Sequence, residues 1–126
     1  MKYLLEVNTL LAAIIQSHPS HAVVDGWAVN KQLAVCPLSE LCFLRVGTHP
    51  NAYNLSMTTA REALRKFIAS TRAEFVAADI PALHASAAKS AEVTDTYMAE
   101  LAAQHHLRLA TLDKGIKHPS AELIKL

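Results

Sequence analysis

The chain begins with an informative stretch, Leu4-Leu5-Glu6-Val7-Asn8-Thr9-Leu10-Leu11, in which a short apolar run meets one acid and then a segment of helical composition. The helical composition extends from Thr9 to Gln16. Asn8 comes directly before it, and an Asn side chain there can accept a hydrogen bond from a free backbone N–H, so we expect Asn8 to be the N-cap. The stretch therefore predicts a strand, an acidic turn and a helix.

Apolar runs and helical segments continue to alternate along the chain. The pattern predicts strands at Tyr3 to Leu5, Leu33 to Leu38, Glu74 to Ala77, Leu107 to Leu112 and near Ala121 to Leu126. It predicts further helices from Ser20 to about Lys31, Leu41 to Val46, about Thr58 to Ser70 with a capping box at Thr59 to Glu62, Pro81 to near Lys89-Ser90, and from Thr94-Asp95 onward. Strands separated by helices favour the α/β class, with a mostly parallel central sheet covered by helices.

Length and composition narrow the class of protein. The 126 residues, 52% hydrophobic and 18% charged, predict a single compact domain over 1–126. A net charge of +1 weighs against a basic, histone-like binder. The two cysteines, Cys36 and Cys42, are expected to be free thiols.

The expected location is the cytoplasm, and no membrane association is predicted. No uninterrupted apolar run approaches the roughly 18 residues that span a bilayer. The first residues resemble a secretory signal superficially, but Glu6 and Asn8 interrupt its apolar core.

Acidic residues follow the predicted strands. Glu6 ends the first apolar run, Glu40 comes two residues after the second, and Asp113 follows the run Leu107 to Leu112, while Asp95 begins a helix. Carboxyl ends of parallel strands meet at one edge of a sheet, where ligands collect. Converging carboxylates raise each other's pKa and need a cation, and an all-oxygen site suits Mg²⁺ or Mn²⁺ better than Zn²⁺.

Each acid also has an ordinary structural explanation. Asp95 can favour the positive end of a helix, Asp113 can be a turn residue, and Glu40 can occupy the first turn of a helix. Glu6 is harder to explain in this way, because a carboxylate between Leu5 and Val7 carries a desolvation cost.

The ordered set of motifs resembles the PIN-domain ribonucleases, and among them the short VapC-type toxins of bacterial toxin–antitoxin pairs. The resemblance covers nearly the whole chain. It is carried by Leu4 to Leu11, by Cys36-Pro37-Leu38-Ser39-Glu40-Leu41 with Arg45, by Thr94-Asp95-Thr96-Tyr97-Met98-Ala99, and by Ala110-Thr111-Leu112-Asp113-Lys114-Gly115.

The resemblance implies a three-layer PIN-like fold and Mg²⁺- or Mn²⁺-dependent endonucleolytic cleavage of RNA. It places Glu6, Glu40, Asp95 and Asp113 on the catalytic, metal-binding positions, and Asn8 and Thr111 on polar positions that orient the site. It also implies a homodimer and inhibition by a cognate antitoxin protein.

One residue departs from the family pattern. The family usually has Asp at the first acidic position, where this chain has Glu6. The extra methylene moves the carboxylate by about 1.5 Å, and Mg²⁺ requires near-ideal geometry. The alternative is therefore a catalytically weakened PIN domain that binds RNA or a protein. A third possibility, a flavodoxin-like phosphoacceptor domain, ranks below the ribonuclease and the binding module, because the paired acids expected after the first strand are missing.

Other polar and aromatic residues carry weaker signals. Arg45, Lys114 and Lys117 are expected to contact the substrate, while Arg61, Arg65, Lys66 and Arg72 more often form a solvated helix face. His18 and His21 have a spacing found in zinc sites but no second pair of ligands, and His105 and His106 point apart on a helix. Trp27 and Phe43 are expected in the core or at a dimer contact.

Overall fold

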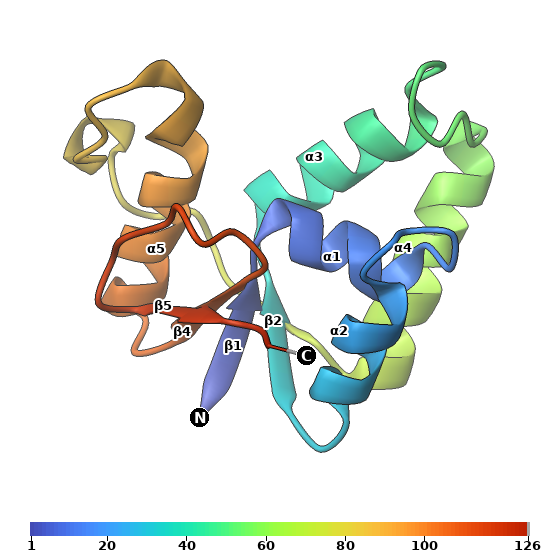
Figure 1. The fold of residues 1–126 in the computed structure, drawn as a ribbon, viewed down its shortest axis with the longest axis horizontal. Helices are drawn as coiled ribbons and strands as arrows, with labels where there is room; N and C mark the ends of the chain where they lie inside the picture. The colour runs from blue at the N-terminus through green and yellow to red at the C-terminus, as the bar shows by residue number, and fades with distance from the viewer. Residues whose placement is uncertain (126) are drawn as a thin grey trace.

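The computed structural model describes residues 1–125, leaving aside the side chain of His84, so the end of the last predicted strand at Leu126 lies outside the described residues. A single five-stranded sheet forms the centre, with the strand order β3-β2-β1-β4-β5 (Figure 1). Every pairing is parallel, which confirms the predicted α/β class. The strands are β1 (Lys2–Leu5), β2 (Gln32–Val35), β3 (Glu74–Phe75), β4 (Arg108–Thr111) and β5 (Ala121–Leu123).

Helices cover both faces of this sheet, giving three layers (Figure 1). The layer on one face contains α1 (Val7–Ile14), α2 (His21–Ala28), α3 (Pro37–Thr48) and α4 (Met57–Thr71), and the other face carries α5 (Val93–Gln104). Two short 3₁₀ turns, η1 (Ala82–His84) and η2 (Ser90–Glu92), precede α5. No helix within residues 1–125 has both the length and the apolar character to cross a membrane.

The hydrophobic core has two parts, one on each face of the sheet. The strands β1, β2 and β4 contribute to both parts, because successive side chains of a strand point to opposite faces. Leu5 packs with Leu10, Phe43 and Leu64 on the face of α1 to α4. Its neighbour Leu4 packs on the α5 face. Each fully buried side chain of this size contributes roughly 1.5–3 kcal/mol.

Two predicted aromatic core residues lie on the α1 to α4 side. Phe43 is fully buried, as predicted. Trp27 is partly buried and meets the ring of Tyr3 edge-on, with centroids 5.1 Å apart. Cys36 and Cys42 are free thiols, also as predicted.

The start of α1 differs from the prediction. The N-cap is Glu6, whose side chain accepts the backbone N–H of Asn8, and Asn8 already lies inside the helix. The helix therefore begins at Val7 rather than Thr9. Asn is the more usual cap, but the backbone is still extended at Glu6, directly after β1.

The start of α3 also differs. The predicted strand to Leu38 ends at Val35, and α3 begins at Pro37 rather than Leu41. Proline suits the first helical position because the missing N–H has no helical partner there. Cys36 and the buried Ser39 form a capping box that fixes this end.

The ends of α2 and α4 are set by residues that the sequence patterns did not indicate. Ser56 caps α4 by accepting the N–H of Thr59, so the predicted capping box starting at Thr59 is wrong, although the helix matches the expected range closely. Helix α2 stops at Ala28 rather than near Lys31. The C-cap Val29 is already non-helical, with a ψ of 127°, and Asn30 follows with a positive φ of 63°.

The predicted alanine-rich helix after Pro81 is wrong. Residues 76–92 form an irregular segment that contains only the turns η1 and η2. Short alanine-rich helices are marginal without a buried apolar face, and Leu83 in this segment is 92% exposed.

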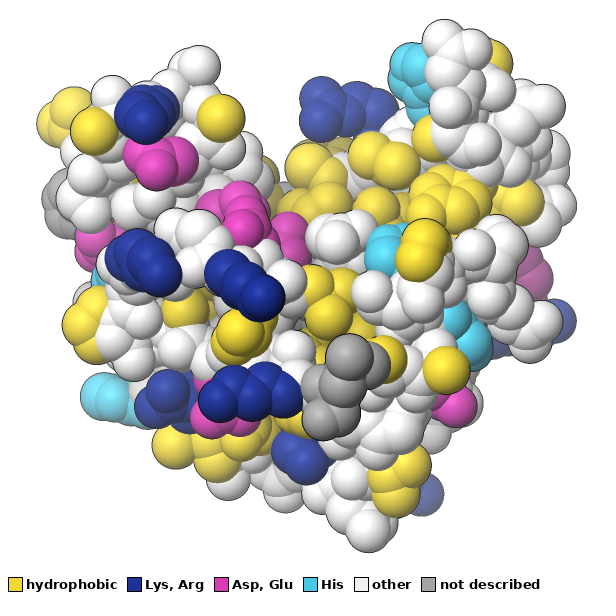
Figure 2. Space-filling model, in the orientation of Figure 1, with side chains coloured by type: hydrophobic (Ala, Val, Ile, Leu, Met, Phe, Trp, Pro, Cys, Tyr) yellow, Lys and Arg dark blue, Asp and Glu magenta, His cyan; other side chains and the backbone are white. Residues whose placement is uncertain are grey.

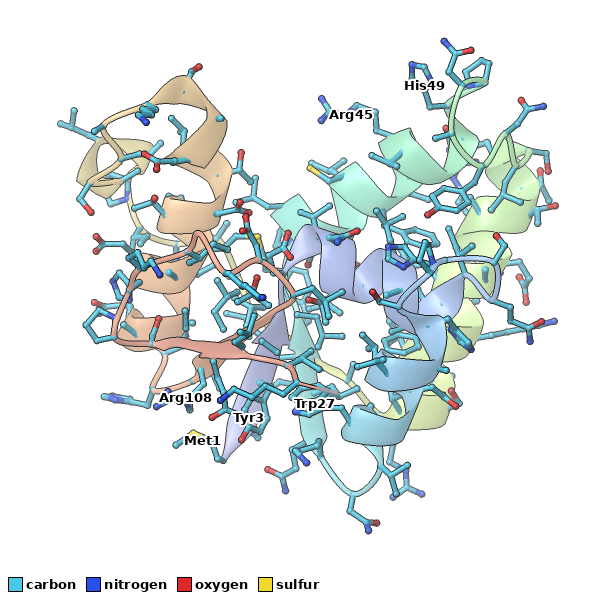
Figure 3. All side chains as sticks on the ribbon, viewed as in Figure 1. Met1, Tyr3, Trp27, Arg45, His49 and Arg108 are labelled. Carbon is cyan, nitrogen blue, oxygen red and sulfur yellow. The ribbon has the colours of Figure 1, made fainter. Side chains whose placement is uncertain are left out.

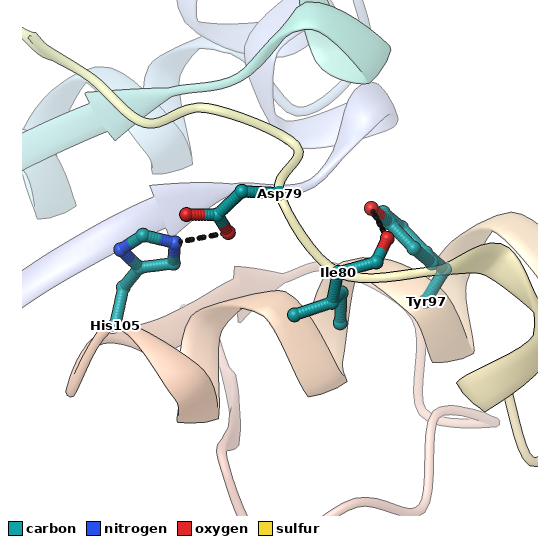
Figure 4. A network of polar contacts seen from close by, with 4 residues as sticks. All are labelled: Asp79, Ile80, Tyr97 and His105. Carbon is teal, nitrogen blue, oxygen red and sulfur yellow. Dashed lines mark hydrogen bonds and ion pairs between the residues drawn. The ribbon is translucent and has the colours of Figure 1, made fainter.

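Side-chain contacts with α5 hold the irregular segment in place (Figure 4). The hydroxyl of Tyr97 donates to the carbonyl of Ile80 at 2.6 Å. His105 Nε2 lies 2.8 Å from Asp79 Oδ1. The segment therefore forms a wall above the sheet on the α5 side.

Candidate active site

Glu6 stands at the carboxyl end of the central strand β1. Its side chain is only 5% exposed. Oxygen Oε1 accepts the backbone N–H of Asn8 at 3.0 Å, whereas Oε2 is buried and makes no hydrogen bond within residues 1–125. A buried carboxylate oxygen without a partner carries a large desolvation cost, so Glu6 is the least satisfied acid of the chain's described part.

The environment of Glu6 favours the protonated form of its carboxyl group. Burial raises the pKa of Glu6 to about 7; the hydrogen bond from the Asn8 N–H opposes the rise, and the charges of Asp95 and Asp113 add to it. Burial also raises the pKa of Asp95, and Asp113 raises it further. These three carboxylates are thus close enough to repel one another.

Asp113 follows β4, the strand that pairs with β1. The hydroxyl of Thr111, at the end of β4, accepts the backbone N–H of Asp113 at 3.0 Å. Asp113 Oδ1 in turn accepts the N–H of Gly115 at 2.7 Å. Thr111 can therefore orient the turn that presents the exposed Asp113 carboxylate.

Glu40 lies somewhat apart from this group. It occupies the first turn of α3, after β2, which pairs with β1 on its other side. Burial raises its pKa, but no other acid is among the causes. Across residues 1–125, no three His, Cys, Asp or Glu side chains are close enough together to hold one ion. Glu6, Asp95 and Asp113 are therefore linked by their charges without forming a closed metal-binding cluster, and Glu40 lies at the margin.

Asn8 approaches the site through its backbone. Its N–H binds Glu6, while its side-chain Oδ1 lies 2.9 Å from His18 Nε2. The Nδ1 atom of His18 accepts the N–H of Ser20, so Nε2 is the donor to Asn8. His21 Nδ1 contacts the carbonyl of Ala12 at 2.7 Å. Both imidazoles are thus engaged in hydrogen bonds, which argues further against zinc at this pair.

Cationic side chains surround the acids. Figure 2 shows acidic side chains in the hollow between α3 and α5, with Lys and Arg side chains on both sides of it. Arg45 extends from α3 away from α4, over this open side (Figure 3). Arg45, Lys114 and Lys117 are exposed, and none makes an ion pair within the described residues. By contrast, Arg65 on α4 pairs with Glu62 of the same helix.

Two buried hydroxyls that support the site were not predicted. Thr9 Oγ1 donates to the carbonyl of Ala110 at 3.0 Å and ties α1 to β4. Ser120 Oγ donates to the carbonyl of Ala99 at 2.7 Å and ties the chain after Asp113 to α5. Polar residues inside apolar patterns are the signal that could have indicated them.

The chemistry of the donor set decides whether it suits a metal ion. The groups are all carboxylates, and Glu6 has a buried oxygen without a partner in the described residues. The charges of Asp95 and Asp113 raise the pKa of Glu6, and the charge of Asp113 raises the pKa of Asp95. Hard divalent cations take oxygen ligands and relieve such repulsion. By its chemistry the donor set therefore suits a divalent cation of this kind, although in residues 1–125 the side chains do not close into a three-ligand cluster.

The parallel sheet, its helical layers and the acids at the carboxyl ends of the central strands define the PIN class of α/β domain. The crystal structure of VapBC2 from Rickettsia felis bound to a DNA fragment from their promoter contains a chain with the same fold. The TM-score is 0.64 at 17% identity, over 98% of this chain and 97% of that one.

The sequence comparisons narrow the class to a family. Ribonuclease VapC38 of Mycobacterium tuberculosis is 33% identical over 121 residues, which span 90% of this chain and 86% of the relative. Ribonuclease VapC29 of the same organism is 30% identical over 123 residues, spanning 94% and 90%. The chain belongs to the VapC ribonuclease family. No protein-family model matches it.

Proposed function

We propose that residues 1–126 form a single PIN-like domain that cleaves RNA internally, as the toxin of a toxin–antitoxin pair. The observation that carries the proposal is the buried Glu6 carboxylate, which has one oxygen without a partner and a pKa raised to about 7. Such a group is costly to the fold, which favours a role in ligand binding. Family membership supports RNA as the substrate.

Glu6, Asp95 and Asp113 hold a divalent cation, Mg²⁺ or Mn²⁺, and Glu40 completes the set from α3. When bound, the cation activates water and neutralises the charge that develops on the scissile phosphate. To hold the cation, Glu6 would have to lose the proton that it retains near neutral pH. The mutual repulsion of the carboxylates supports this assignment.

Other residues of the chain position the acids and the substrate. Thr111 fixes the turn of Asp113 through its backbone N–H, and the N–H of Asn8 holds one oxygen of Glu6. Arg45, Lys114 and Lys117 supply positive charge for the phosphates of an approaching RNA strand.

A second candidate is a PIN domain that binds RNA or protein with little or no cleavage. The observation that favours it is the use of Glu6 as the N-cap of α1, together with the lack of a closed three-ligand cluster in the described chain. A carboxylate engaged in capping has one oxygen left for other partners.

The proposal extends to the partners and the location. The Rickettsia felis chain of the same fold belongs to a VapBC2 assembly, which supports a protein partner for this chain too. We expect that partner to be a cognate antitoxin that inhibits cleavage. We also propose a homodimer that acts in the cytoplasm.

The deciding experiment incubates the purified protein with RNA and either Mg²⁺ or Mn²⁺, beside the Asp113→Asn variant. Cleavage by the wild type and a loss of about 100-fold or more in the variant are expected, because a ligand of the cation is removed. Equal cleavage by both proteins would contradict the role of Asp113. Absence of cleavage by either, with RNA still bound, would favour the binding module.

A further inference from the structure

A cavity of about 410 Å³ lies beside the acids on the α5 side. Asp95 and Asp113 line it, so it shares a wall with the candidate active site. Part of its lining consists of small residues, namely Ala87, Ala88 and Ala91 of the irregular segment and Gly115. Its volume falls within the range of roughly 300–1,000 Å³ found for small-ligand sites.

The wall formed by residues 113–120 is held by several hydrogen bonds. Asp113 Oδ1 accepts the N–H of Gly115, and the carbonyl of His118 accepts the N–H of Ala121 at 3.0 Å. Ser120 Oγ anchors this stretch to α5 through Ala99. The polar groups on this wall are therefore held in fixed positions relative to α5.

His118 lines the cavity in a defined tautomer. Its Nδ1 atom accepts the backbone N–H of Ser120 at 3.1 Å. Ser120 Oγ is also 3.0 Å from Nδ1, but its proton is directed to the carbonyl of Ala99. An accepting Nδ1 has no proton, so the neutral ring carries its proton on Nε2. Nε2 makes no hydrogen bond within the described chain and is left as a donor.

Apart from the acid Glu92, the remaining polar groups suit a nucleotide unit. Lys117 brings a positive charge without an ion pair in residues 1–125, and Thr96 brings a hydroxyl from α5. Ser86 already donates to Glu100 Oε1 at 3.2 Å, so its hydroxyl can only accept. A cation, an imidazole donor and hydroxyls match the phosphate, the base oxygens and the ribose hydroxyls.

We infer that this cavity binds the nucleotide next to the scissile phosphate of the RNA strand, with Lys117 on its phosphate and His118 Nε2 donating to its base or ribose. The inference rests on the proposed function and adds to it a subsite that recognises the neighbouring nucleotide. A strand whose phosphate lies at Asp95 and Asp113 places an adjoining nucleotide here, because these acids form the common wall.

The test measures binding of a fluorescent five-nucleotide RNA by anisotropy in EDTA, where no cleavage occurs. The variants are Lys117→Ala, His118→Ala and His118→Gln, and Lys66→Ala on α4 is the control for loss of one positive charge at a distance. Both alanine variants at the cavity are expected to weaken binding about tenfold relative to the control, as loss of one hydrogen bond to a charged or buried partner implies.

Two further readouts separate binding from structural damage. Lys117→Ala should reduce the slope of log affinity against log salt by about one. His118→Gln keeps a side-chain N–H donor and should restore most of the affinity lost in His118→Ala.

Opposite results would overturn the subsite. Binding by the cavity variants equal to that of Lys66→Ala, together with Mn²⁺-dependent cleavage by the wild type, would overturn it and leave the ribonuclease function standing. An antitoxin peptide that binds the Lys117 and His118 variants more weakly than the wild type, while RNA binding stays unchanged, would assign the cavity to the protein partner instead. Failure of the wild type both to bind and to cleave RNA would overturn the proposed function as well.

Discussion

Glu6 accepts the backbone N–H of Asn8 at 3.0 Å through one carboxylate oxygen, while its other oxygen is buried without a partner in residues 1–125. One side chain thus caps a helix and presents an unsatisfied oxygen at the edge of the sheet. Because burial and the neighbouring Asp95 and Asp113 raise its pKa to about 7, its protonation couples folding to pH.

Stability of the metal-free protein should fall as the pH rises from about 4.5 to about 7. The unfolded Glu6 loses its proton near its ordinary pKa of 4.5, whereas the folded carboxyl keeps it to about 7. In this window the folded state binds more protons, so deprotonation destabilises it, by roughly 3 kcal/mol in all.

Urea unfolding in EDTA at pH 5 and pH 8 measures this effect, with Glu6→Gln for comparison. The variant should lose most of the pH dependence and be the more stable protein at pH 8. An identical pH dependence in both proteins would show that Glu6 titrates normally. Adding Mn²⁺ should stabilise the wild type at pH 8 more than the variant.

Glu6→Asp should increase RNA cleavage without loss of stability. Asp is among the preferred N-cap residues, so the cap of α1 is retained. The shorter side chain restores the acid that the family usually has at this position. The measurement is kcat/KM on RNA with Mg²⁺ and with Mn²⁺, and the gain should be larger with Mg²⁺, which tolerates less distortion. An unchanged absence of cleavage in both proteins would support the binding module.

Thr111→Val should reduce both cleavage and stability. The variant removes the hydroxyl that accepts the Asp113 N–H and keeps the shape of this buried side chain. The expected loss is about 1–3 kcal/mol of stability, from the unsatisfied N–H, with at least tenfold lower kcat/KM. Thr111→Ser keeps the acceptor and is the matched control. Equal losses in the two variants would indicate that the lost methyl, rather than the hydrogen bond, matters.

Gly115→Ala should lower activity, whereas Gly26→Ala should not. A Cβ at Gly115 would lie 3.1 Å from Asp113 Oδ1, so the carboxylate or the turn must shift. A Cβ at Gly26 meets nothing within 4 Å, and alanine favours the helix α2 by up to about 1 kcal/mol. Cleavage assays and thermal melting of both variants test this pair. Full activity of Gly115→Ala would show that the turn adapts easily.

The fold class and the family of this chain could be predicted from the sequence because both depend on local sequence patterns. Apolar runs separated by helical segments predicted the parallel sheet, and the ordered motifs around Glu6, Glu40, Asp95 and Asp113 indicated the VapC family, which the relatives confirm. The role of these acids in metal binding stays a prediction.

The errors have physical causes that depend on tertiary contacts. Alanine propensity favours a helix after Pro81, but Leu83 is exposed there and the segment packs on the core through a few residues such as Ile80 and Ala85 rather than through a helical face. Capping statistics favour Asn8 over Glu6, but the end of β1 fixes the position of the cap. The orientation of His118 depends on its hydrogen bond with Ser120, which is itself bound to Ala99, and no sequence spacing indicates these hydrogen bonds.

The position of β1 between β2 and β4 has a consequence for synthesis of the protein. Glu6 is synthesised early, whereas its companion Asp113 follows β4 and lies 107 positions later in the chain (113 − 6). A nascent chain therefore lacks an assembled acidic edge until β4 and Asp113 have also been synthesised and have left the ribosome.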